Sequence, residues 1–390
     1  MSPPEPAVAA ACVERGVLLA RAYLSRVAEP PAAALAAFVE DVGAVEAAER
    51  VRRGAVPEKV ARQTEARRGV DRAQTDLACA EGIGARLLVP EDSGWPRWPF
   101  AAFALTGDPD LAPPLALWVR GPARLAELSE RAVAVVGARA ATGYGVHIAC
   151  DIAGGLAERE CTVVSGAAIG IDGAAHRGAL AAGGPTVAVL ACGIDRAYPA
   201  AHAALLHRIG ESGLVVTEYP PTAVPARHRF LVRNRLLAGM AGGTLLVEAG
   251  LRSGAQRTAA DALALGRLVM AVPGPVTSGM SAGCHELIRK GALLVSRVEE
   301  VLEAVGRLGI DLAAEPDRPV QPTDGLDPVQ VRVHDALPAR AARDICWLML
   351  ESGLPIEVVR PALVELERRG LAEYREGRWQ RPSWPRTGQR

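Results

Sequence analysis

Lysine is almost missing from this sequence, aromatic residues are few, and neither sign of charge is in excess. Lys59 and Lys290 are the only lysines, aromatic residues make up 4% of the 390 residues, and the formal net charge is zero. A chain without net charge has no overall field that attracts polyanions, so affinity for them requires a local cluster of arginines. The apolar fraction of 49% and the charged fraction of 23% are those of an ordinary globular protein, not of a disordered chain.

The patterns of metal-binding, secreted and membrane proteins are also lacking. The seven cysteines form no C-x-x-C pair and alternate poorly with histidines, so we expect no metal site and reduced thiols in the cytoplasm. The first 24 residues have no basic start, and Glu14 and Arg15 interrupt their apolar stretch, which is unlike a signal peptide. No apolar run reaches transmembrane length, so we expect a cytoplasmic protein without membrane contact.

The chain divides into regions of different rhythm. Residues 1–90 are rich in alanine with helical spacing and predict a small helical domain. Residues 91–130 gather Trp and Pro and are interpreted as a lead-in linker that ends in a short strand, ahead of a domain that extends to residue 310. Residues 311–328, rich in Pro and Asp, predict a second linker before a last domain at 329–390.

Between residues 131 and 310, short Val- and Leu-rich runs bounded by Gly or Pro alternate with helical-length segments. Runs that are apolar throughout are typical of parallel strands buried on both faces of a sheet. The expected fold class is therefore α/β, a Rossmann-like doubly wound and mostly parallel sheet, with ligands at the carboxyl ends of its strands. The expected strands are 132–137, 161–166, 185–191, 213–219, 243–250, 267–274 and 292–296.

The last domain carries two short amphipathic helices, 342–353 and 355–370, and an alternating stretch around Gly377 that is typical of a β-hairpin. Helix, helix and hairpin in this order predict a winged-helix-like domain. The second helix balances acidic residues against arginines, and a helix without net positive charge is poorly suited to reading a DNA groove. We therefore favour a wing that contacts protein or is structural.

Glycine-rich loops after the expected strands indicate phosphate binding without the common nucleotide motifs. The loop 136–145 precedes a helix that Thr142 is placed to cap, but Ile148 replaces the third glycine of G-x-G-x-x-G. No lysine follows a glycine loop, which excludes a Walker A motif. We therefore expect phosphate to be held by backbone N–H groups and arginines, with no bound cofactor.

The stretch SGAAIGIDGAAH, residues 165–176, is the most informative of these loops. Ser165 and Gly166 end a strand where backbone can approach a ligand, and Gly170 permits the turn that follows. Asp172 is interpreted as the cap of the next helix, and His176 as a hydrogen-bonding residue on that helix. A Ser165–Asp172–His176 hydrolase triad is disfavoured because the G-x-S-x-G elbow is absent, so we expect no catalytic residue.

Two further loops concentrate basic residues near the same sheet edge. PARHRFLVRNRLL, residues 225–237, has five basic residues and no acid, and the loop near residue 252 adds arginines beside small hydroxyl and glycine residues. Glu218 and Glu248 end strands, where they can orient arginines. An arginine-rich edge with an aromatic residue suits an extended anionic ligand better than one phosphate. The residues expected to contact it are Gly170, Phe230, Arg233, Asn234, Arg235, Arg252, Ser253, Gly254 and Thr258.

Eight motifs follow one another over roughly residues 85 to 300: VVGARAATGYG, SGAAIGIDGAAH, GIDRAYP, TEYPP, F-x-x-RNR, VEAG-x-x-SGAQRTA, VPGPV and SAGCHELI-x-x-GA. In this order they closely resemble the DprA/Smf family, the DNA-processing proteins of natural transformation. The resemblance implies a homodimer that binds and protects single-stranded DNA and helps to load the RecA recombinase. The DNA contacts that it implies are Arg139, Ser165, Gly166, Arg233, Asn234 and Arg235.

The sequence departs from the family pattern at two positions. Leu231 stands where the family often has Pro, and Ala200 stands where some members have Lys. We expect Arg196 to supply the phosphate contact that Ala200 lacks. The stretch 284–295 pairs an amphipathic helix with a peripheral strand, and we expect it to form the homodimer interface because sheet edges must be covered.

Two other functions stay open. The stretch 239–250 is similar to the P-G-G-x-G-T-x-x-E signature of lysine-decarboxylase-like, cytokinin-activating enzymes, which cleave nucleotide N-glycosidic bonds. It offers Gly242, Gly243, Thr244 and Glu248, but the Pro is missing and the Glu falls one residue late. On a strand, that shift turns the carboxylate to the other face. The third possibility is a scaffold protein in which the sheet is a vestigial nucleotide-binding fold and the winged-helix-like domain carries the function.

Overall fold

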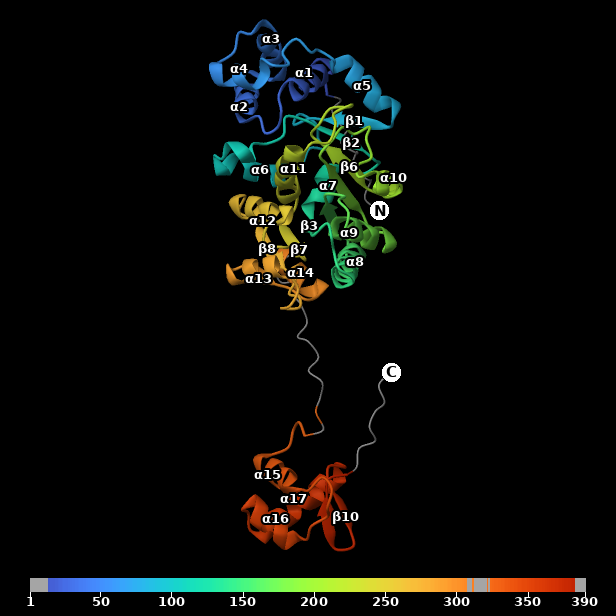
Figure 1. Ribbon diagram of the computed structural model, residues 1–390, viewed down its shortest axis with the longest axis vertical. Coiled ribbons are helices and arrows are strands. Elements are labelled where there is room, and N and C mark those ends of the chain that lie inside the picture. The colour runs from blue at the N-terminus through green and yellow to red at the C-terminus, as the bar shows by residue number, and fades with distance from the viewer. Residues whose placement is uncertain (1–12, 307–310, 312–320, 322, 383–390) are drawn as a thin grey trace, which may run out of the picture. The chain divides into compact units, whose positions relative to one another are not determined.

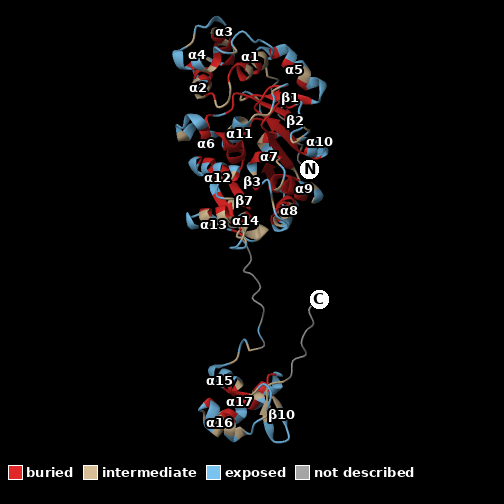
Figure 2. Ribbon diagram, in the orientation of Figure 1, coloured by how far each residue is buried: buried red, intermediate tan, exposed pale blue. Residues whose placement is uncertain are grey.

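The computed structural model describes residues 13–306, 311, 321 and 323–382. These residues form two compact units, divided between residues 314 and 315, and each unit has its own buried core (Figures 1 and 2). Most of the expected linker 311–328 lies outside the described residues.

The first unit is built on a sheet of nine strands in the order β1-β2-β6-β5-β4-β3-β7-β8-β9. Strands β3 to β9 are parallel, whereas β1 and β2 add an antiparallel edge to β6. The expected doubly wound α/β class is confirmed. The strands are β1 Ala85–Leu88, β2 Leu117–Arg120, β3 Ala132–Gly137, β4 Thr162–Ser165, β5 Thr186–Leu190, β6 Leu214–Thr217, β7 Gly243–Val247, β8 Leu268–Ala271 and β9 Leu293–Leu294.

The direction of winding reverses at β3. Strands β4, β5 and β6 follow on one side of it, and β7, β8 and β9 follow on the other. The loops after β3 and β7 therefore leave the sheet beside a switch point, where doubly wound folds bind ligands. Each of the seven strands expected after residue 131 is present within its expected bounds.

Helices cover both faces of this sheet, because successive strand residues point to opposite sides. Val133 and Leu245 belong to a core shared with α8, α9 and α14, whereas Ala134 and Leu246 belong to a core shared with α6, α7, α11, α12 and α13. Figure 2 shows the buried sheet between helices with exposed outer sides. The helices are α6 Arg97–Thr106, α7 Leu125–Glu130, α8 Gly143–Glu158, α9 Ile171–Ala181, α10 Ala203–Ser212, α11 Arg227–Met240, α12 Gly254–Ala264, α13 Ala282–Arg289 and α14 Val298–Val305.

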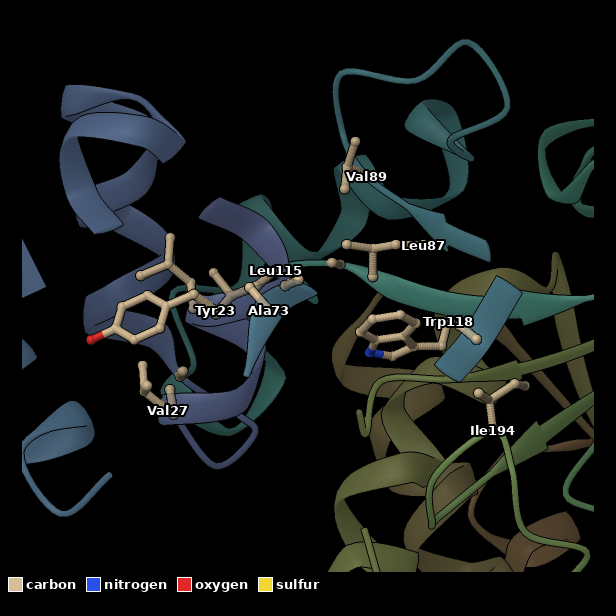
Figure 3. Packing of buried hydrophobic residues seen from close by; sticks show 14 of the residues in the cluster. Tyr23, Val27, Ala73, Leu87, Val89, Leu115, Trp118 and Ile194 are labelled. Atoms are coloured by element: carbon tan, nitrogen blue, oxygen red, sulfur yellow. The ribbon is translucent and has the colours of Figure 1, made fainter. Parts of the chain in front are cut away.

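The N-terminal segment is helical, as expected, but it shares a core with the sheet. Tyr23 and Val27 of α1 belong to the same buried cluster as Trp118 of β2 and Ile194 after β5 (Figure 3). Outside this cluster, Arg26 donates a hydrogen bond to the carbonyl of Pro221 at 2.7 Å. The helices are α1 Arg15–Val27, α2 Ala33–Val42, α3 Ala44–Arg53, α4 Glu58–Thr64 and α5 Ala73–Gly82.

Residues 91–130 differ from the expected linker. Besides the expected short strand, β2, this stretch forms α6, α7 and a short 3-10 helix at Pro109–Leu111. Most of its aromatic residues are core residues, since Trp95, Phe100 and Phe103 pack edge to face and are buried, whereas Trp98 is exposed. Because these aromatic residues are interspersed with prolines, the sequence shows no clear helical spacing here and therefore predicts a linker.

The second unit contains the two expected helices and the hairpin around Gly377. A further helix, α15, precedes them and was not predicted; Asp327 and Gln330 form a capping box at its start. Val333, Leu348 and Leu363 are buried between the helices. The elements are α15 Pro328–Ala336, α16 Ile345–Ser352, α17 Ile356–Arg368, β10 Glu373–Arg375 and β11 Arg378–Gln380. Within the described residues, no helix is long and apolar enough to cross a membrane.

Candidate nucleic-acid interface

A cleft of about 1070 Å³ lies at the carboxyl edge of the sheet, beside the switch point. It is lined by the loop after β3, the first half of α11, and the loop from β7 into α12. This is the edge at which the sequence predicts ligand binding. The polar side chains that line it are Arg139, Asp172, Tyr198, Arg227, Arg233, Asn234, Arg252, Ser253, Arg257 and Thr258.

The cleft is strongly cationic in a chain without net charge, because five arginines line it against Asp172 as the one acidic residue. Arg139, Arg227 and Arg252 are exposed, and none of them forms a hydrogen bond or ion pair with a described residue. Arg257 differs, since Asp261 and Asp110 neutralise it at 2.7 and 3.7 Å. The unpaired arginines are therefore free to bind an anionic ligand.

Aromatic rings stand beside these arginines. Phe230 is half-buried, and its ring centroid lies 5.5 Å from that of Tyr198 and 5.1 Å from the Arg139 guanidinium carbon. Tyr198 is itself exposed. The cleft thus presents flat faces of the kind on which nucleic-acid bases stack.

Arg233 lies in the floor of the cleft and is almost fully buried. Its Nη1 donates a hydrogen bond to the carbonyl of Val189, while its Nε has no partner among the described residues. Burial lowers the pKa of Arg233 and raises the pKa of the neighbouring Asp172 carboxyl, and the opposite charge of each counteracts the shift of the other. A Cβ at Gly166 would lie 2.0 Å from Nη1 of Arg233, so Gly166 makes room for the guanidinium.

Asp172 does not cap its helix. Gly170 is the N-cap of α9, and the Asp172 carboxylate instead accepts hydrogen bonds from the backbone N–H groups of Gly166 and Ala168 at 3.1 and 3.4 Å. The side chain therefore holds the loop after β4 in place, which differs from its interpretation as a cap.

Arg235 is a correction to the predicted DNA contacts. It is 1% exposed and forms a two-pronged ion pair with Glu218, with both N–O distances at 2.8 Å. Its Nε donates a third hydrogen bond to the carbonyl of Ala112. Glu218 thus orients an arginine as expected, but that arginine joins α11 to β6 and to the chain before β2 instead of facing a ligand.

Four other predicted contacts lie outside the cleft lining. Ser165 is fully buried and donates to the carbonyl of Val135 at 2.6 Å, and Gly166 packs against Arg233. Gly170 has a φ of +90° at a point where a Cβ would lie 2.2 Å from the carbonyl oxygen of Ala138, so glycine is required for the turn itself. Arg196 is exposed but does not reach the cleft.

The start of α12 brings the remaining predicted residues together. Asn234 donates from Nδ2 to the carbonyl of Gly254 at 3.2 Å, which fixes α11 against the first turn of α12. Ser253 is the N-cap residue but makes no capping hydrogen bond, and its hydroxyl is buried without a partner in the described part of the chain. Thr258 lies one turn further along the cleft wall. Free N–H groups at this helix start suit an anion.

His176 forms a side-chain hydrogen bond, as interpreted from the sequence, and it is fully buried. The Thr186 hydroxyl donates its one hydrogen to the carbonyl of Val163, so the 2.8 Å contact with His176 requires Nδ1–H of the imidazole to be the donor. Burial lowers the pKa of His176 to about 3 and keeps the ring neutral. Because Ser165 donates to a backbone carbonyl, the two side chains do not form a nucleophile and base.

Glu248 does not orient an arginine. Its carboxylate accepts hydrogen bonds from the backbone N–H and the hydroxyl of Thr142, at 2.8 and 2.6 Å. The Thr142 hydroxyl in turn accepts from the N–H of Gly145, which confirms it as the cap of α8. A glycosidic-bond-cleaving enzyme would need this carboxylate for catalysis, but here Glu248 holds the N-terminus of α8 in place.

Tyr198 and Arg227 line the cleft but are absent from the predicted site. Both follow expected strands, Tyr198 after β5 and Arg227 after β6. Arg227 belongs to the basic stretch 225–237, which the sequence already places near this edge. Placing the loop after β5 on the same edge would also have identified Tyr198.

Comparison with known proteins by sequence identifies one family. The family model described as DNA recombination-mediator protein A matches residues 86–306. The DNA processing protein DprA of Mycobacterium tuberculosis H37Rv is 57% identical over 362 residues, 92% of either chain. Protein Smf of Escherichia coli K12 is 42% identical over 217 residues, 55% of this chain and 56% of that protein. The crystal structure of DprA from Streptococcus pneumoniae superposes with a TM-score of 0.60 at 30% identity, covering 75% of this chain and 99% of that one.

Proposed function

The chain belongs to the DNA recombination-mediator protein A (DprA) family of DNA-processing proteins, and on this premise we propose that its cleft binds single-stranded DNA without cleaving it. The observation that carries the proposal is the set of exposed, unpaired arginines in one cleft of a neutral chain, Arg139, Arg227 and Arg252. Arginines without an internal carboxylate lose no ion pair when they bind a phosphate.

The aromatic groups favour a single strand over a duplex. Phe230 and Tyr198 present partly exposed ring faces beside Arg139, and unpaired bases can stack on them. The bases of a duplex are already stacked and paired, so such rings gain nothing from them. The uncapped start of α12, at Gly254, offers N–H donors to the backbone of the same strand.

Binding of labelled oligothymidylate and of duplex DNA, measured over a range of salt concentrations, tests this function. The single strand is expected to bind more tightly, and log affinity is expected to fall with log salt by about 0.7 for each phosphate held. Tighter binding of the duplex, or affinity independent of salt, would contradict the proposal.

Loading of RecA and assembly into a homodimer belong to the same proposal and rest on the family resemblance. The enzymatic alternative is tested by incubating the protein with nucleoside monophosphates. Because Glu248 is bound to Thr142 and Asp172 is held by two backbone N–H groups, no free base is expected. Release of free base would overturn the non-enzymatic function.

A further inference from the structure

A carboxylate of the N-terminal helical segment already occupies a cationic cluster beside the cleft. Glu29, in the turn after α1, accepts hydrogen bonds from Nε and Nη2 of Arg229 at 2.7 and 3.0 Å. Arg67, which follows α4, donates to it at 2.7 Å, and Nε2 of His228 lies 3.2 Å away. One anion is thus surrounded by basic side chains from two parts of the chain.

The surroundings of Glu29 are those of a phosphate site. His228 and Arg229 stand in the first turn of α11, whose N-terminus has no side-chain cap. Arg229 is held in place by a hydrogen bond from its Nη1 to the carbonyl of Val224 and by the Tyr219 ring, 4.6 Å from its guanidinium carbon. A guanidinium fixed in this way binds a phosphate as readily as a carboxylate.

The cluster neighbours cleft-lining residues in the chain and is partly open to solvent, although the Arg229 side chain is only 13% exposed. Arg227 and Phe230, on either side of His228 and Arg229 in the chain, both line the cleft. The side chains of His228 and Arg67 are 60% and 39% exposed, and that of Glu29 is 29% exposed. Burial alone would raise the pKa of the Glu29 carboxyl. The hydrogen bonds from Arg229, Arg67 and His228 instead hold this pKa below its usual range, so the residue is an anion at neutral pH.

Resting on the proposed function, we propose that Arg67, His228 and Arg229 form a further phosphate subsite for a single strand that extends beyond the cleft. Glu29 fills this subsite in the free protein and competes with DNA for it. A phosphodiester that displaces Glu29 leaves the charge at the cluster unchanged and frees the carboxylate to solvent. The N-terminal helical segment therefore limits how much of a long strand the protein holds.

Replacement of the carboxylate by its neutral isostere tests the competition. Glu29→Gln is expected to raise affinity for an oligothymidylate of about 16 nucleotides and to steepen its salt slope by about 0.7, which is roughly fivefold in affinity at ~0.1 M salt. A strand of about 4 nucleotides, which the cleft alone accommodates, is expected to bind both proteins equally. Adding Arg67→Ala to Glu29→Gln is expected to reverse part of the gain.

Glu46→Gln is the matched control, because Glu46 is also a carboxylate of the N-terminal segment but, among the described residues, pairs only with Arg50 on its own helix. It is expected to leave the slope unchanged. If Glu29→Gln does not fold, Glu29→Asp replaces it, since a shorter carboxylate reaches the arginines less well and shifts affinity in the same direction.

Unchanged affinity and slope for the long strand in a folded Glu29→Gln protein would overturn the inference. That result is distinct from failure of the proposed function, in which the folded wild-type protein binds no oligonucleotide at either length.

Discussion

At the scale of single residues, arginines close together in the chain have different roles. Arg235 forms a buried ion pair with Glu218, whereas Arg252 is exposed and unpaired in the cleft. Arg235→Ala leaves the Glu218 carboxylate buried without a partner and is expected to cost about 3–5 kcal/mol of unfolding free energy. Arg252→Ala is expected to change stability by less than about 0.5 kcal/mol but to flatten the salt slope of DNA binding by about 0.7. Urea unfolding and salt-titrated binding measure the two effects.

Arg368→Ala serves as the control for both changes, because Arg368 pairs with Glu365 on the surface of the second unit. It is expected to alter neither stability nor slope appreciably. If Arg252→Ala has the same salt slope as the wild-type protein, Arg252 does not contact the DNA. If Arg235→Ala is as stable as the wild-type protein, Arg235 does not join α11 to β6.

His176 predicts a particular acid sensitivity. Burial lowers its pKa from 6.5 to about 3. Between these two pH values, the imidazole is therefore protonated in the unfolded chain and neutral in the folded chain. The stabilisation from neutral His176 is complete above pH 6.5 and is lost as the pH falls from there towards 3, by about 2 kcal/mol at pH 5. His176→Asn keeps a donor near the Thr186 hydroxyl but does not titrate. Its unfolding free energy should therefore fall less between pH 7.5 and pH 5, and an equal fall in both proteins would contradict the assignment.

At the scale of elements, the strands after residue 131 could be predicted because each is a short apolar run bounded by Gly or Pro. The shared ligand edge followed from their parallel order. Burial of arginines could not be predicted in the same way. Arg233 and Arg235 lie on α11 within a stretch that has no acid, and their partners, Asp172 and Glu218, come from other elements. The pattern of strands and basic loops in the sequence therefore located the cleft. It did not show which arginines of α11 face the cleft and which face the core.

The charge of α17 gives a prediction for the second unit. Glu365 accepts hydrogen bonds from both Arg368 and Arg369, which hold its pKa at about 2. Counted over residues 356–369, three glutamates balance three arginines, so the helix has no net positive charge. Such a helix contributes little to phosphate binding. Removal of the residues after 320 is therefore expected to leave single-strand affinity nearly unchanged in a gel-shift titration. A tenfold loss, about 1.4 kcal/mol, would instead assign DNA binding to this unit.

At the scale of the whole molecule, one edge of the nine-stranded sheet is left open in the described chain. Strand β9 pairs only with β8, and its two residues, Leu293 and Leu294, are 43% and 49% exposed. Apolar side chains on an uncovered edge strand are a site for pairing with another chain. This edge and most of the preceding helix α13 lie within 284–295, which the sequence predicts to form the homodimer interface.

The prediction is that light scattering at micromolar concentration gives the mass of two 40.8 kDa chains. Lysine on an edge strand opposes pairing because it brings charge to the contact, so Leu293→Lys with Leu294→Lys is expected to yield a folded monomer. Leu105→Lys, at an exposed position on α6, is the control and should remain dimeric. The monomer should still bind a strand of about 4 nucleotides, since a single chain already forms the cleft. If the wild-type protein is itself a monomer, or the double variant stays dimeric, the interface lies elsewhere or is absent.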